Sequence, residues 1–157
     1  MAKALGMKVL LAERKGASEV RPGRTAFDTA LKEGTVFMLV TPLDATTRDM
    51  ISTAELEMMN STALTVNVGR GGVINESALA DALRNGTIAG AATDVFAIEP
   101  ASKQTSPLLD PSIPNLLLSP HVAWYSSRTI NGTLEILKRN IEGFVAGKMQ
   151  NVVIAGR

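Results

Sequence analysis

Five short apolar runs, each three to five residues long, constrain most strongly what this chain can fold into. The stretches between them have the spacing of amphipathic helices rather than that of strands. Several of the runs are continuous instead of alternating with polar residues, which is typical of strands whose sheet is covered by helices on both faces. The pattern therefore predicts an α/β protein with a parallel sheet. The runs lie at residues 9–12, 36–40, 64–66, 88–92 and 116–118.

Three short helices are predicted between these runs, and residues that favour helix ends mark two of them. Ser52 or Thr53 can cap the second helix, and Asn75 can cap the third. Asn85 and Gly86 follow the third helix and form a typical stop signal. The helices are expected at residues 26–31, 53–59 and 75–84.

The longest predicted helix spans about residues 126–146, where apolar residues recur at spacings of three or four and predict one buried stripe. Gly147 ends it. At the other end of the chain, residues 2–5 followed by Gly6 have the pattern of a last helical turn and its terminal glycine. That turn leads directly into the strand expected at residues 7–12. The stripe consists of Ile130, Leu134, Leu137, Ile141 and Val145.

Composition excludes several classes of function. The 157 residues, 45% of them hydrophobic, suffice for one globular core. The net charge is +1, and the basic and acidic residues are scattered along the chain. That scatter argues against nucleic acid or a membrane as partner and leaves small molecules or proteins. Without cysteine and with one histidine, neither disulfides nor a multi-histidine metal site is expected. No run approaches the roughly 18 apolar residues of a membrane span, and no signal peptide is recognisable, so the cytoplasm is the expected location.

Three polar residues follow breaks in the apolar pattern and together suggest an active site for hydride transfer. His121, the single histidine, follows the last run; imidazole titrates near pH 6.5 and suits proton transfer. Glu99 is the candidate carboxylate partner that would orient the ring. Arg70 lies among glycines and could hold a substrate carboxylate in two hydrogen bonds. Taken singly, His121 and Glu99 fit a structural role better, as a packed histidine and a solvated carboxylate. Arg70 taken singly fits an exposed loop arginine as well as it fits a substrate-binding residue.

Two acidic residues point to a dinucleotide. Asp94 stands at a strand end, where it could accept a hydrogen bond from a nicotinamide carboxamide or cap the turn. Glu13 ends the first expected strand, where a dinucleotide-binding fold places the acid that binds the adenosine ribose and disfavours a 2′-phosphate. Arg14 and Lys15 follow at once and could instead attract that phosphate. NAD is therefore the expected cofactor, with NADP left open.

Several segments together resemble the signature of the D-isomer-specific 2-hydroxyacid dehydrogenases. The resemblance implies that Arg70 binds the substrate carboxylate, that Glu99 orients the histidine, and that His121 is the general acid/base. It also implies a Rossmann-like, doubly wound sheet that binds NAD through Glu13, Thr41, Pro42, Val68, Gly69 and Asp94. The segments are residues 67–79 (NVGRGGVINESAL), 90–96 (GAATDVF), 99–100 (EP), 107–109 (PLL) and 120–123 (PHVA).

The chain departs from the family pattern at its start. It begins inside the first helix of the cofactor domain, so the first strand, the G-x-G-x-x-G turn and the substrate domain are not represented. In the usual strand order the first strand would lie between residues 7–13 and 63–67. Asn75 stands where the family usually has aspartate, and either residue can cap a helix. Residues 1–147 are thus expected to be a partial NAD-binding domain, and 148–157 a tail that returns to the substrate domain.

Within the family, residues 12–17 (AERKGA), residues 20–25 (VRPGRT) and Trp124 look most like the glycerate dehydrogenase or hydroxypyruvate reductase branch. The implied function is NAD-dependent reduction of a small 2-keto acid such as hydroxypyruvate or glyoxylate, and the resemblance also implies a homodimer. The alternative is a non-catalytic fragment or a cofactor-sensing interaction module. Turnover on titration with NADH would separate these readings.

Overall fold

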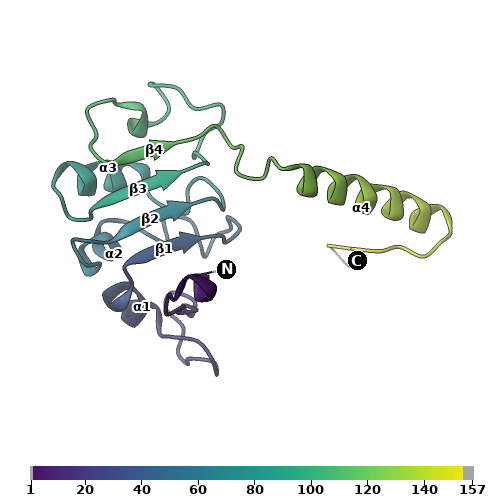
Figure 1. The fold of residues 1–157 in the computed structure, drawn as a ribbon, viewed down its shortest axis with the longest axis horizontal. Coiled ribbons are helices and arrows are strands. Elements are labelled where there is room, and N and C mark those ends of the chain that lie inside the picture. The colour runs from purple at the N-terminus through teal and green to yellow at the C-terminus, as the bar shows by residue number, and fades with distance from the viewer. Residues whose placement is uncertain (1, 154–157) are drawn as a thin grey trace. The chain divides into compact units, whose positions relative to one another are not determined.

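The computed structural model describes residues 2–153. Its four strands form one parallel sheet in the order β1-β2-β3-β4 (Figure 1). The predicted α/β class and parallel sheet are confirmed. The elements in chain order are η1 (Ala2–Leu5), α1 (Phe27–Glu33), β1 (Val36–Leu39), α2 (Thr53–Met58), β2 (Leu64–Asn67), α3 (Glu76–Arg84), β3 (Gly90–Thr93), η2 (Pro107–Leu109), β4 (Leu116–Leu118) and α4 (Ser127–Val145).

The helices α1, α2 and α3 form one layer, in which α1 packs on α2 and α2 packs on α3. Buried side chains of this layer and of the sheet belong to one hydrophobic cluster, so the layer lies against the sheet. Between this layer and the strands lies the core, whose fully buried side chains include Leu56, Leu79 and Ile88. The sheet residues that face this layer, such as Leu39 and Thr65, are buried as well. Burial of apolar surface between helix layer and sheet is the main stabilising contribution here.

The opposite face of the sheet is open, which differs from the expectation of helices on both faces. The strand register places Val36 beside Leu64, and Met38 beside Val66, on this face. Met38 is 62% exposed and Leu117 of β4 is 70% exposed. Among the described residues, the helices of this unit therefore cover one side of the sheet.

The prediction of a strand at residues 7–13 is wrong. These residues make only an isolated parallel bridge, between Ala12 and Thr25. The prediction that the first strand of the family fold would lie beside residues 63–67 is wrong too. These residues form β2, which pairs with β1 on one side and with β3 on the other. The preceding turn fits its prediction, since η1 spans Ala2–Leu5 and Gly6 takes the left-handed conformation (φ 79°).

The chain divides into two compact units, Met1–His121 and Val122–Arg157. The second contains α4, whose N-cap residue Ser126 accepts a hydrogen bond from the Thr129 N–H (3.1 Å). The expected buried stripe of α4 is largely exposed, with Leu134 58% and Val145 81% exposed, because the described part of this unit, residues 122–153, offers no layer to pack against it. Residues 154–157 of the predicted tail lie outside the described residues.

Candidate active site

The candidate site residues lie on loops that follow neighbouring strands. Arg70 follows β2, Asp94 follows β3, and His121 follows β4. Because the strands are parallel and adjacent, their carboxyl ends lie at one edge of the sheet, where open α/β folds bind ligands.

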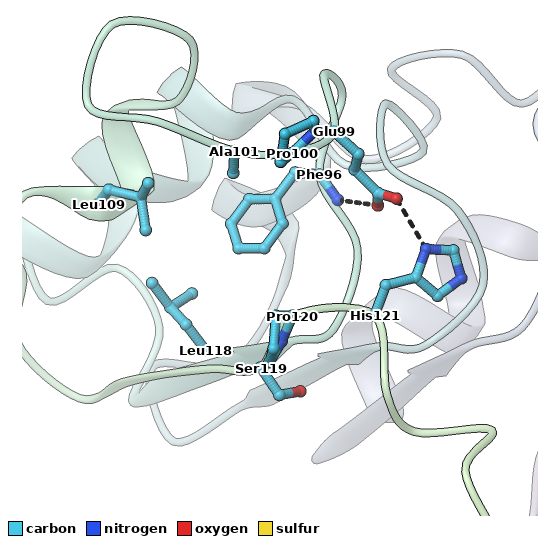
Figure 2. A pocket seen from close by; sticks show the side chains of 9 residues that line it. All are labelled: Phe96, Glu99, Pro100, Ala101, Leu109, Leu118, Ser119, Pro120 and His121. Carbon is cyan, nitrogen blue, oxygen red and sulfur yellow. Dashed lines mark hydrogen bonds and ion pairs between the residues drawn. The ribbon is translucent and has the colours of Figure 1, made fainter.

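Glu99 and His121 form a direct pair. The Nδ1 atom of His121 lies 2.7 Å from Oε2 of Glu99, and Oε1 of Glu99 accepts a hydrogen bond from the Phe96 N–H (2.9 Å), as Figure 2 shows. The hydrogen bond to His121, helped by the one from Phe96 and opposed by desolvation, lowers the pKa of the Glu99 carboxyl below its ordinary value. The ring is therefore oriented by an ionised carboxylate, as a proton-transfer histidine requires.

The backbone of His121 is held in a conformation that few residues adopt. Its φ is 56°, in the left-handed region, and its N–H donates to the Asp94 carbonyl (2.7 Å). The Asp94 carboxylate is buried and accepts a hydrogen bond from the Ser119 hydroxyl (2.5 Å). Asp94 thus fixes the histidine loop from two sides, and a strained residue at a strand end is common at functional sites.

Arg70 lies in a turn that Asn67 fixes. The Asn67 side chain accepts from the Gly69 N–H (3.1 Å) and donates to the Arg70 carbonyl (3.0 Å). A Cβ on Gly71 would stand 1.8 Å from the Phe96 carbonyl oxygen, so this turn touches the backbone of the Glu99 loop. The Arg70 guanidinium donates to the Gly69 carbonyl (2.7 Å), and Arg70 is an exposed residue.

Thr41 and Gly69 form a close-packed wall at the same edge. A Cβ on Gly69 would stand 2.7 Å from the Thr41 carbonyl oxygen, so only glycine fits there. Within residues 2–153, the buried Thr41 hydroxyl has no hydrogen-bond partner. A buried donor without a partner is costly, and a bound nucleotide with polar groups would satisfy it. Pro42 and Val68, the other residues expected to line the cofactor cleft, are their neighbours in sequence.

Glu13 lies on the segment before α1, and its carboxylate is already hydrogen-bonded within the chain. Its side chain is 3% exposed and pairs with Arg21 through two hydrogen bonds of 2.5 and 2.8 Å. The backbone N–H groups of Arg14 and Arg21 also donate to it (2.9 and 3.3 Å). These donors, led by the Arg21 side chain, hold the pKa of Glu13 far below its ordinary range. Lys15 pairs instead with Glu55 (2.8 Å).

A cavity of about 570 Å³ adjoins the Glu99–His121 pair (Figure 2). Its walls are mainly apolar, and the two paired residues form part of its polar lining, which is the usual composition of a small-molecule site. The lining residues are Phe96, Glu99, Pro100, Ala101, Leu109, Leu118, Ser119, Pro120 and His121.

Sequence reasoning missed Asn67, Ser119 and Arg21. Each binds a predicted site residue: Asn67 the Arg70 turn, Ser119 the Asp94 carboxylate, and Arg21 the Glu13 carboxylate. Asn67 and Ser119 are polar residues at strand ends, which is a usable signal. Arg21 lies eight positions from Glu13 in a loop, and nothing in the spacing indicates the pair.

The family comparison decides what kind of site this is. The family model of the D-isomer specific 2-hydroxyacid dehydrogenase NAD binding domain matches residues 1–123. The chain belongs to this family. The resemblance read from the sequence and the Rossmann-like fold are thereby confirmed, and the cofactor expected for the family domain is NAD. Curated relatives of this chain carry the names of enzymes, among them a glycerate dehydrogenase and glyoxylate reductases.

Individual dehydrogenases of the family are similar over nearly the whole chain. The glycerate dehydrogenase of Methylorubrum extorquens is 44% identical over 98% of this chain and 48% of its own length. The NAD complex of a D-isomer specific 2-hydroxyacid dehydrogenase from Lactobacillus delbrueckii ssp. bulgaricus has a TM-score of 0.78 at 26% identity, covering 98% of this chain and 50% of its own. An NADPH-dependent glyoxylate/hydroxypyruvate reductase from Sinorhizobium meliloti, in complex with NADP and malonate, has a TM-score of 0.75 at 31% identity, covering 91% and 44%.

The chain spans about half the length of the curated relatives that it matches. Among the described residues, no group of three or more acidic or histidine side chains is placed to hold a metal ion. No helix within residues 2–153 is both long enough and apolar enough to cross a membrane.

Proposed function

We propose that this chain serves an NAD-dependent oxidoreductase that interconverts a small 2-hydroxy acid and its 2-keto acid, with hydroxypyruvate or glyoxylate as the keto substrate. The observation that carries the proposal is the Glu99–His121 pair at 2.7 Å, presented at the carboxyl edge of the sheet beside the Arg70 turn. The similarity to glycerate dehydrogenase and glyoxylate reductases supports this choice of substrate.

His121 is the proposed general acid/base. In the reducing direction it gives a proton to the carbonyl oxygen while that oxygen gains electron density, and in the oxidising direction it takes the proton back. Glu99 keeps the ring oriented through its hydrogen bond with Nδ1. Arg70, an exposed residue, binds the substrate carboxylate with its planar guanidinium.

When bound, the nicotinamide dinucleotide supplies the hydride that reduces the carbonyl carbon. Thr41, Pro42, Val68 and Gly69 would hold it at the edge of the sheet, where Gly69 lets the backbone at Thr41 pack closely. Asp94 would stand near the nicotinamide carboxamide, and Glu13 would define the adenosine end of the cleft. We also propose a cytoplasmic homodimer, as the family resemblance implies.

The test is a comparison of NADH binding and NADH oxidation by the purified protein with hydroxypyruvate or glyoxylate. His121→Gln should lower turnover by about 100-fold or more, because general acid catalysis is lost, while NADH binding should stay within about threefold. Leu134→Gln, on exposed α4, is the control and should leave both unchanged. Near-full turnover in His121→Gln would overturn the assigned role, and NADH binding without any turnover would favour a sensor.

A further inference from the structure

We propose that Arg21 sets the cofactor selectivity of this protein by shielding the Glu13 carboxylate, so that a dinucleotide with a phosphate on the 2′-oxygen of its adenosine ribose is accepted alongside NAD(H). The inference rests on the proposed function, since it concerns the adenosine end of the same cleft. In this proposal Arg21 is a positioning residue, because it affects cofactor selectivity by covering the Glu13 carboxylate.

The shielding is visible in the geometry of the pair. The Nη2 and Nε atoms of Arg21 lie 2.5 and 2.8 Å from the two carboxylate oxygens of Glu13, the parallel two-bond arrangement that is strongest for arginine. The backbone N–H groups of Arg14 and Arg21 add two further donors. With its side chain 3% exposed, Glu13 has little acceptor capacity left for ribose hydroxyls.

Backbone hydrogen bonds hold together the two segments that carry Arg21 and Glu13. The Glu13 N–H donates to the Thr25 carbonyl (2.7 Å), and the Thr25 N–H donates to the Leu11 carbonyl (2.8 Å). Arg24 donates to the Ala12 carbonyl (2.9 Å) from the same loop. These bonds bring the loop that carries Arg21 back against the segment that carries Glu13, so the guanidinium stays in place.

The surface that a ligand meets at this point is cationic. Arg21 is 54% exposed at its side chain and Arg24 is 38% exposed, while Glu13 lies beneath them. Arg24 adds a second positive charge at 3.9 Å from the carboxylate. An uncovered acid at this position repels a 2′-phosphate and favours the unphosphorylated ribose, but a neutralised and covered acid does not.

The decisive variant is Arg21→Ala, which uncovers Glu13. We expect the dissociation constant for NADPH to rise at least tenfold, while that for NADH changes less than threefold or falls, because free carboxylate oxygens can accept from ribose hydroxyls. The double variant Arg21→Ala/Glu13→Gln should recover NADPH binding to within about threefold, since a neutral amide does not repel the phosphate. Both constants are measured by fluorescence titration of the purified protein, independently of turnover.

Lys32→Ala is the control for net charge. It removes one positive charge from an exposed position of α1, and Lys32 is not among the donors to the Glu13 carboxylate. We expect less than a threefold change in either dissociation constant. Arg21→Lys keeps the charge without the two-bond geometry and should give a partial loss of NADPH binding, which keeps the test valid if Arg21→Ala does not fold.

The outcomes separate this inference from the function on which it rests. If neither dinucleotide binds the unmodified protein, the proposed function fails and the inference fails with it. If both bind and Arg21→Ala leaves the NADPH/NADH ratio unchanged, only the inference is overturned. If NADPH binding is lost in Arg21→Ala and the double variant does not recover it, Arg21 contacts the phosphate itself, and shielding is wrong.

Discussion

At the scale of single residues, the site is made of polar side chains that are held by hydrogen bonds within one strand-end loop or between two of them. Glu99 is anchored to the Phe96 N–H, Asp94 lies between the loops after β2 and β4, and Asn67 fixes the Arg70 turn. Such anchoring lowers the entropic cost of presenting a charged group in one orientation. It also makes the pKa of an anchored carboxyl group depend on the residue that it is hydrogen-bonded to, and this dependence can be measured by titration.

The ionisation of Glu99 should depend on His121. The His121 hydrogen bond is the largest cause of the lowered Glu99 pKa, so His121→Ala should raise the Glu99 titration midpoint towards its ordinary 4.5. Because the pKa is lowered by folding, the pair stabilises the protein above about pH 4.5, and this stability is lost as the pH falls through the folded pKa. Carboxyl ¹³C NMR titration measures the midpoint directly.

Asp110 gives an internal reference for that titration. Its pKa is lowered to about 2 by Ser112 and Arg84, with no contribution from His121, so its midpoint should not move in His121→Ala. An unchanged Glu99 midpoint, with Asp110 also unchanged, would contradict the His121–Glu99 pair in solution.

At the scale of elements, the helix caps are the features that the sequence predicts best. Asn75 caps α3 through its Oδ1 atom, which accepts from the Ala78 N–H (3.0 Å), and its Nδ2 atom donates to Asp49 (3.2 Å). The second bond is one that the aspartate usual in the family could not make. Two carboxylates would meet there instead, so asparagine at this position suits the neighbouring Asp49.

The cap gives a prediction for the stability of α3. Asn75→Ala should lower the free energy of unfolding by about 1 kcal/mol, because an N-terminal N–H of the helix loses its acceptor. Asn75→Ser keeps an acceptor oxygen and should cost only a few tenths of that amount. Urea denaturation followed by circular dichroism measures both. Equal losses in the two variants would show that the cap oxygen does not stabilise α3.

Strands were predicted less well than helices, because a strand exists only through a hydrogen-bonded neighbour. An apolar run such as residues 9–12 has the right composition, but within residues 2–153 its backbone bonds Thr25 and no strand of the sheet. The adjacency of β1 and β2 was missed for the same reason. Spacing along the chain reveals a candidate strand and does not reveal which strand lies beside it.

At the scale of the whole sheet, the four strands have one face covered by α1, α2 and α3 and one face open. The apolar residues of the open face at its β1 side are Val36, Met38 and Leu64, each at least 43% exposed. Among the described residues, β1 also has a strand neighbour on one side only. An edge strand with exposed apolar side chains is a site of self-association.

Met38→Lys should therefore reduce concentration-dependent self-association of the purified chain. Met38 is 62% exposed in the middle of β1, and a lysine there places a charge on the open face, as natural edge strands often do. Sedimentation velocity at increasing protein concentration measures the associated fraction. Ile98→Lys, which changes an apolar residue that is 56% exposed outside the strands, is the control for net charge. If both substitutions reduce association equally, net charge and not the edge of β1 governs it.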